Sequence, residues 1–571
     1  MKTLHKILAT LLLGAACSGC DLTLIPEDKV TPQTYFQSEV DLRLWTNQFY
    51  TLLDSPDSAS GLNADDMVDK SMGDVISGTR MASDESGWTW TSLRKINYYL
   101  QNSHNCTDEA ARTKYDGVAY FFRAYFYYVK VRRYGDVPWY DTVIGSEEEE
   151  LLKKPREDRG IIMDHVMSDL DDAIDMLPRD KDVARVTRWA ALAFKSRAAL
   201  YEGTWRKYRG LPDADKYLQQ AADAAATFIA ESGYSLYKEG TEPYRDLFCS
   251  DDAKQDEVIL ARLYNFEGLN LAHSVQFNIR NAATGFTRRF MNHYLMADGS
   301  RFTEKEGHET MFYTEETAGR DPRMAQTVLC PGYVAKGESA ATPNDMTAMT
   351  GYEPIKFVST AAHSGASKGT SDWPLFRTAE VYLNYAEAKA ELGEMDAAVW
   401  DQTIAPLRSR AGVTSVIPAK ADPYMEAYFL NTVTDKWILE VRRERGIELC
   451  LEMGLRWDDD MRWHMGDLLT SDNNPWTGIY IGSTSYTYDY TGLSTDDNGD
   501  PVPDFYIRPG EDTEHSIAIS NTGANQTFSL NGEGNIVWEY RRVWSEKKYL
   551  RPIPLTAITR NPNLEQNALW K

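Results

Sequence analysis

The sequence lacks both a long apolar run and an excess of positive charge. The apolar segment near its start, residues 7–16, is only about half of the roughly 20 residues that a membrane-spanning helix needs. The formal net charge is −24, whereas proteins that bind nucleic acid concentrate basic side chains on their surface. A membrane-spanning segment is therefore not expected, and nucleic acid is not expected as a partner.

Cysteine is scarce as well, with six in 571 residues. Four of them are widely spaced in the body of the chain: Cys106, Cys249, Cys330 and Cys450. Domains that depend on a disulfide framework carry far denser cysteine. The fold must therefore be stabilised by its apolar core.

The remaining two cysteines, Cys17 and Cys20, directly follow the apolar run. A C-x-x-C pair serves redox or zinc chemistry when it opens a helix or faces a second ligand pair, and no second pair follows here. Basic residues, a short apolar core and small residues before the cut instead predict a secretory signal over residues 1–19. The end of this segment resembles a bacterial lipobox. We expect lipidation of Cys20, which would anchor the protein to a membrane without spanning it.

Recognisable catalytic and metal-binding motifs are also lacking. The sequence has no P-loop and no H-E-x-x-H, and its one match to G-x-S-x-G, residues 365–369, lies in a loop-rich segment rather than at a predicted strand-to-helix turn. Asp460 and His464 are spaced i, i+4, but no third ligand is evident, so we interpret them as a helix-surface pair rather than a metal site. We expect no cofactor. The paired carboxylates of a glycoside hydrolase stay open, because distances among 85 acidic residues cannot be seen in a sequence.

Aromatic residues, in contrast, are abundant, with 15 Trp and 33 Tyr. Many of them lie in polar segments that contain glycine, such as residues 87–100 and 477–492. Flat rings with polar edges suit surfaces that bind sugars, yet they also serve to pack long loops onto a protein body. Composition alone leaves both interpretations open.

Helical periodicity predicts a mainly α fold. It is clearest in residues 119–135, 158–178, 187–205, 213–233, 377–412 and 434–466. We expect N-caps at Thr187 and Asp213 and a helix end at Gly135. Between these blocks lie long irregular segments at about residues 55–90, 237–373 and 471–538. The pattern predicts a scaffold of helices with large loop inserts on one face.

Two details of these helices carry further expectations. Alanines 386, 388, 390, 397 and 398 recur at helical spacing, as close packing in tetratricopeptide-type hairpins requires. The charged block at residues 443–448 is spaced for ion pairs within and between helices. Both features are expected to be structural.

Five segments, in this order, resemble the SusD/RagB family of surface glycan-binding lipoproteins of Bacteroidetes. They are residues 121–140, 186–205, 376–412, 444–463 and 549–570. The resemblance implies an α-helical core with four tetratricopeptide-like hairpins and an irregular region that binds glycan. It also implies one unit from residue 20 to 571, with halves at about 20–235 and 260–571.

The resemblance further implies a function at the cell surface. Such a protein captures oligo- or polysaccharide at the outer membrane and delivers it to a TonB-dependent transporter of the SusC type, without catalysis. By position, the segment RKINYYLQN resembles the family's glycan-binding region. The implied contact residues are Trp88 and Trp90 as ring platforms, Asn97 as a hydrogen-bonding group, Asp65 and Asp66 in the adjoining loop, and Tyr264, Phe286 and Arg288 in the second insert.

Two other functions remain open on the residues alone. A tetratricopeptide-type scaffold would bind a peptide or protein in a groove between helices. A surface glycoside hydrolase would cleave the sugar that it holds. Loops rich in aromatic residues, combined with the lack of a recognisable catalytic set, favour binding over cleavage.

Overall fold

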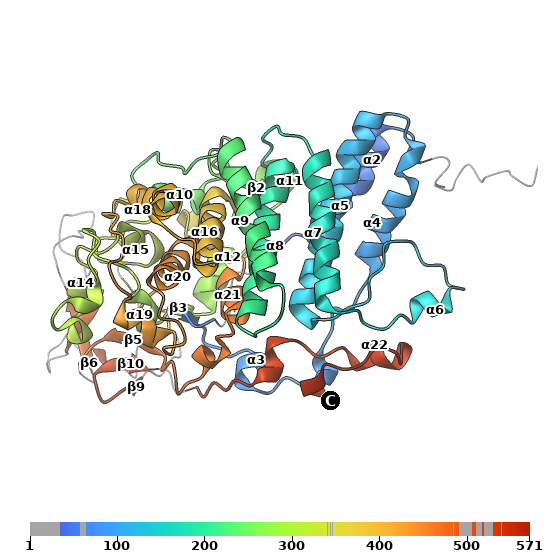
Figure 1. Cartoon of the computed structure of the whole chain (residues 1–571). Coiled ribbons are helices and arrows are strands. Elements are labelled where there is room, and N and C mark those ends of the chain that lie inside the picture. Colours follow the sequence, from blue (N-terminus) through green and yellow to red (C-terminus); the bar gives the residue numbers. More distant parts are fainter. Residues whose placement is uncertain are drawn as a thin grey trace, which may run out of the picture.

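The computed structural model describes residues 35–56, 64–339, 341, 342, 344, 347–482, 485–489, 505–509, 517, 518, 529–537 and 540–571. The expected signal segment and Cys20 lie outside these residues. The fold is mainly α, as predicted, with a few short strands (Figure 1). Within the described residues, no helix combines the length and the apolarity needed to cross a bilayer.

The amino-terminal half is a row of upright helices that pack side by side (Figure 1). In this row α5 packs against α7, and α8 packs against α9. The helices are α2 (Glu39–Asn47), α4 (Thr91–Asn102), α5 (Glu109–Tyr134), α7 (Arg159–Met176), α8 (Arg188–Lys207) and α9 (Ala214–Glu231). These antiparallel neighbours match the predicted hairpin core.

Local signals set the bounds of these helices. Thr187 caps α8 by accepting a hydrogen bond from the backbone N–H of Ala190, and α5 ends at Gly135, which has a φ of 75°. Both were predicted. Asp213 does precede α9, but it adopts a φ of 64° and its side chain makes no cap, so this part of the prediction is wrong.

Glycine permits close contacts between neighbouring helices. A Cβ on Gly117 of α5 would lie 2.9 Å from Cβ of Met176, and one on Gly203 of α8 would lie 2.8 Å from Cγ of Leu218. Real Cβ atoms do not approach so closely, so both positions must lack a side chain. The α5–α7 and α8–α9 pairs therefore depend on these two glycines.

The carboxy-terminal half continues the helical packing. Its helices are α16 (Thr378–Glu391), α17 (Ala397–Gln402), α18 (Ile404–Ala411), α20 (Lys436–Leu449) and α21 (Leu455–Arg462). α16 packs against both α9 and α20. Alanines 386, 388 and 390 are buried as predicted, but 397 and 398 are exposed. The first turn of α17 faces solvent, because Val399 and Trp400 carry its buried face.

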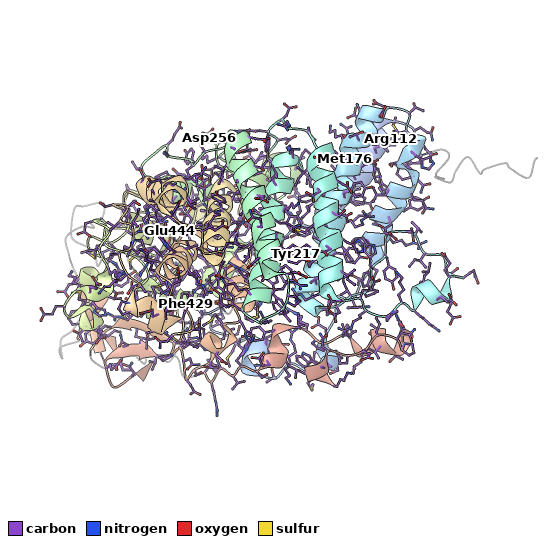
Figure 2. The ribbon with its side chains drawn as sticks, in the orientation of Figure 1. Arg112, Met176, Tyr217, Asp256, Phe429 and Glu444 are labelled. Carbon is purple, nitrogen blue, oxygen red and sulfur yellow. The ribbon has the colours of Figure 1, made fainter. Side chains whose placement is uncertain are left out.

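Buried ion pairs connect α20 to its neighbours. Glu444, labelled in Figure 2, accepts hydrogen bonds from Arg323 at 2.6 Å and from Arg408 at 2.9 Å. Glu448 accepts from Arg323, Arg377 and Arg410. The predicted role of the charged block is thus confirmed, and most of its pairs cross between elements.

The remaining elements are short. The strands pair as β1 with β3, β2 with β4, β5 with β10, β10 with β9, and β6 with both β7 and β8. The strands are β1 (Met67–Val68), β2 (Val258–Arg262), β3 (Gly285–Phe286), β4 (Trp373–Arg377), β5 (Thr477–Tyr480), β6 (Ser485–Asp489), β7 (Phe505–Pro509), β8 (Ile517–Ala518), β9 (Ser529–Leu530) and β10 (Asn535–Val537). The short helices are α3 (Asp74–Ser77), α6 (Glu149–Leu152), α10 (Pro243–Cys249), α11 (Phe266–Leu269), α12 (Val275–Asn281), α13 (Arg288–Met291), α14 (Tyr313–Glu316), α15 (Pro322–Thr327), α19 (Pro423–Tyr428) and α22 (Leu555–Arg560).

The carboxy-terminal segment runs along the lower edge of the molecule, beside α3 and beneath the upright helices (Figure 1). One buried apolar cluster includes Phe36, Phe194, Phe376 and Ile553, which come from both ends and the middle of the chain. The division into halves near residue 235 stays a prediction.

Candidate functional site

Three of the predicted binding residues meet at one cavity. Trp88, Trp90 and Asn97 line a hollow of about 670 Å³. Its walls are the loop at residues 85–91, the start of α4, the segment at 138–144 and part of the carboxy-terminal segment around α22. Elements more than 400 residues apart in sequence therefore form this cavity together.

The two tryptophans stand edge to face beside each other. Their ring centroids are 5.4 Å apart and their planes meet at 78°. Each ring is half-buried: Trp88 packs on Tyr134 at 4.9 Å, and Trp90 packs on Tyr140 at 5.4 Å. Edge-to-face contacts of this kind are favourable and fix ring orientation. The core thus holds both rings in place while part of each stays accessible.

Asn97 adds a buried hydrogen-bond acceptor without a partner to the wall of the same cavity. Its side-chain N–H groups donate to the backbone carbonyls of Tyr140 at 3.0 Å and Thr142 at 3.2 Å. Both donors are therefore occupied, and no donor among the described residues reaches Oδ1, although Asn97 is only 1% exposed. A buried acceptor without a partner costs about 1–3 kcal/mol. Oδ1 itself is buried, so a ligand hydroxyl removes that cost only after a small shift of the cavity wall admits it.

Lys130 of α5 contacts the loop at residues 85–91, which carries both tryptophans. Its Nζ donates to the carbonyl of Gly87 at 2.6 Å and lies 5.4 Å from the Trp90 ring centroid. Burial, followed by the positive charge of Arg133, lowers the pKa of Lys130 to about 7. The ammonium group therefore connects α5 to the loop. Because the group is buried, its charged form is poorly solvated.

Replacing Lys130 by methionine should change how stability depends on pH. The pKa of Lys130 is lower in the folded than in the unfolded chain, so wild-type stability should rise as pH increases above 7. From about pH 7 to about pH 9 we expect the wild type to gain ~2 kcal/mol relative to Lys130→Met. Urea unfolding of both proteins across this range measures the difference. Parallel curves would show that Lys130 keeps its ordinary pKa.

The structure places four other predicted residues in the interior. Asp65 is fully buried and pairs with Arg456 at 2.6 Å, while Phe286 pairs with Met67 across β1 and β3. The carboxylate of Asp66 is also fully buried, and burial, with the charge of Asp65, raises its pKa to about 7. Arg288 is buried beside Glu316 at 3.5 Å. These four residues lie near one another, but burial removes them from the candidate site.

Tyr264 lies apart from both the cavity and the four buried residues. It follows β2, is half-buried, and meets His273 edge to face at 4.8 Å. Its backbone N–H donates to Asp372 at 2.9 Å. It does not line the cavity at Trp88 and Trp90, so the second insert contributes none of its predicted contacts there.

Sequence reasoning missed part of the cavity wall. Tyr140, Arg94, Asn561 and Leu564 line the hollow but were not predicted to do so. Asn561 is fixed by a hydrogen bond from its side chain to the carbonyl of Lys154 at 2.9 Å. The similarity of residues 549–570 to family members was a usable signal, but it did not reveal which part of the body this segment covers.

The possible metal pair does not form. Asp460 is buried beside Asp65 and Arg456, and His464 instead pairs with Glu546 at 3.1 Å. The interpretation as a helix-surface pair is therefore also wrong. Across the described part of the chain, no three His, Cys, Asp or Glu side chains are grouped to hold a metal ion.

Comparison with known proteins agrees with this architecture. Residues 273–570 match the SusD family, and residues 89–200 match a family described as "Starch-binding associating with outer membrane". SusD-like protein P25 of Formosa agariphila is 23% identical over 45% of this chain and 51% of its own length. A SusD-like protein of Bacteroides ovatus is 25% identical over 46% and 50%. The matched region thus spans about half the length of these relatives.

Solved structures extend the similarity of fold to nearly the whole chain. A SusD-like protein of Bacteroides fragilis has a TM-score of 0.69 and 21% identity, covering 95% of this chain and 99% of the other. A SusD-like carbohydrate binding protein of the same species has a TM-score of 0.70 and 19% identity, covering 93% and 100%. Since the match at residues 273–570 alone spans more than half of the sequence, this chain belongs to the SusD family.

Proposed function

We propose that this protein binds an oligo- or polysaccharide in the cavity at Trp88, Trp90 and Asn97 and holds it without cleaving it. The description of the family matched at residues 89–200, and the carbohydrate binding named for one structural relative, support this function. The observation that carries the proposal is the placement of two accessible tryptophan rings beside a buried acceptor that lacks a donor.

The chemistry of the cavity suits a sugar. A pyranose ring presents apolar C–H faces, which pack on aromatic rings, and hydroxyl groups, which need hydrogen-bond partners. Trp88 and Trp90 supply the rings, and Oδ1 of Asn97 accepts from a hydroxyl. Thr89 and Arg94 add polar groups to the wall. Because the cavity is open, we expect a modest affinity, with Kd between ~1 mM and ~1 μM.

The place of action is also part of the proposal. Lipidation of Cys20 would tether the body to the outer membrane, in keeping with the family description "associating with outer membrane". A tethered binding protein can pass its ligand to a TonB-dependent transporter of the SusC type. Copurification of such a transporter with the tagged, lipidated protein tests this step, and the untethered Cys20→Ala variant is its matched control.

An array of plant, algal and host glycans tests the binding function directly. We expect the purified protein to be retained by one class of glycan and to release no shorter product from it. Released oligosaccharide would instead identify a hydrolase. Retention by none of the glycans, together with capture of peptides, would favour the tetratricopeptide-type scaffold.

A further inference from the structure

A second cavity lies beside the tryptophan site. It has a volume of about 490 Å³ and is lined by residues 78 and 80 after α3, the end of α5, the start of α21 and residues 547–551. The same two chain segments pass through both cavities: residues 78–91 on one side and residues 547–564 on the other. A ligand seated at the first cavity is therefore close to the second.

The second cavity is rich in positive charge. Two lining residues, Asp54 and Asp458, are acidic. Six are basic: Arg80, Arg132, Arg133, Lys547, Lys548 and Arg551. This composition is opposite to that of the whole protein, whose formal net charge is −24. A local excess of cations in a protein of such negative net charge indicates a site that can attract an anion.

Nearby carboxylates do not balance these cations one to one. Arg132 pairs with Asp458 and Arg80 with Asp74 at 2.8 Å. Glu85 is shared by three arginines: Arg80 at 3.0 Å, Arg133, and Arg551 at 3.6 Å. Lys547 and Lys548 have no carboxylate partner among the residues that the structure describes. Their neighbourhood therefore retains unneutralised positive charge.

The electrostatics of two lining residues point the same way. Burial and then the charge of Lys547 lower the pKa of Lys548. Burial and then the charges of Arg133 and Arg80 lower the pKa of Arg551. Burial and like charges thus disfavour both cations within the cavity, and a bound anion would offset these effects.

We propose that this cavity is a subsite for an anionic group on the glycan, either a uronate carboxylate or a sulfate ester. The inference rests on the proposed function, because it assumes that the neutral part of the ligand lies at Trp88 and Trp90. Arg133 connects the two sites: its guanidinium lines the second cavity and donates to the carbonyl of Ser86, which lines the first, at 3.0 Å. Arginine suits the planar, paired oxygens of carboxylate and sulfate groups.

Matched ligand pairs test the subsite and separate the two anions. One pair is a uronate oligosaccharide and its carboxyl-reduced counterpart, and the other is a sulfated oligosaccharide and its desulfated counterpart. By calorimetry we expect the wild type to prefer the acidic member of one pair by about tenfold at low salt, with the preference falling as salt screens the charges. Lys547→Gln with Arg551→Gln should abolish the preference without weakening the neutral ligand.

The matched control is Lys238→Gln with Lys305→Gln, which removes two exposed lysines outside both cavities. It should keep the preference, and thermal unfolding should show both variants folded. The subsite would be overturned if the wild type bound neutral ligands as tightly as acidic ones. It would also be overturned if the preference survived in Lys547→Gln/Arg551→Gln. Either result would leave the proposed function intact.

The opposite failure is distinguishable as well. If the wild type bound no oligosaccharide of either pair, the proposed function would fail, and titration with galacturonate and inorganic sulfate would test the subsite alone. Millimolar binding that is lost in Lys547→Gln/Arg551→Gln would keep the anion site. No binding of either anion would overturn it.

Discussion

Replacing Trp88 and Trp90 together by alanine should abolish retention of the protein on the glycan that it binds. Together with Tyr140, the two rings form the aromatic surface that the cavity offers to a sugar face. Loss of a central aromatic contact typically costs at least ~2 kcal/mol of binding free energy, and the double change should weaken binding by more than ~30-fold. Affinity electrophoresis in gels that contain the glycan measures this loss.

The double variant needs a control for stability, because both rings also pack on the core at Tyr134 and Tyr140. Trp437→Ala removes another half-buried tryptophan, which contacts Trp400 and lies outside the cavity. We expect both variants to unfold at lower temperature than the wild type, but only the first to lose retention. Undiminished retention in the folded double variant would move the site elsewhere.

Replacing Glu448 by glutamine should strongly lower the free energy of unfolding. Its carboxylate accepts hydrogen bonds from Arg323, Arg377 and Arg410, all of them buried. Removing one partner of a buried ionic cluster leaves the others uncompensated and costs about 3–5 kcal/mol. Chemical denaturation should therefore show a much lower midpoint for Glu448→Gln.

A surface pair provides the matched control for this change. Glu231 pairs with Arg179 at 3.3 Å, and both side chains are exposed. Exposed pairs contribute ~0–1 kcal/mol, so Glu231→Gln should unfold nearly as the wild type does. Equal effects of the two substitutions would show that the buried cluster is not a main source of stability.

The same cluster should make the protein sensitive to acid. Although burial acts in the opposite direction, the charges of Arg443 and Arg408 lower the pKa of Glu440 to about 2. A carboxylate whose pKa is lower in the folded state contributes stability above its unfolded pKa, and this contribution is lost as pH falls through the folded value. The stability that Glu440 contributes should therefore decline between about pH 4.5 and about pH 2.

Sequence patterns predicted the scaffold well because its helices are encoded locally. Apolar periodicity and end signals such as Thr187 and Gly135 act within a few residues, and the structure confirms both. Local patterns could not place Asp65, whose burial depends on Arg456 at the other end of the chain. Asp65 and Asp66, which belong to a polar, loop-rich stretch, therefore resembled residues of a binding loop although both are buried in the fold.

The candidate site was predictable in part for the same reason. Trp88, Trp90 and Asn97 lie within ten residues of one another, so one local segment predicted that all three would lie together, as they do at the cavity. The residues around α22 meet these three only in the folded chain. Arg80, Arg133 and Arg551 likewise come together only on folding. Overall charge could not reveal this second feature, because a net charge of −24 hides a small cavity of opposite sign.

Hydrogen–deuterium exchange of the protein with and without its retained glycan tests the central claim most directly. Bound sugar should slow exchange in the peptides that cover residues 85–97, 138–144 and 554–564, which together enclose the tryptophan cavity. Protection confined to other regions, with these three segments unchanged, would contradict the account.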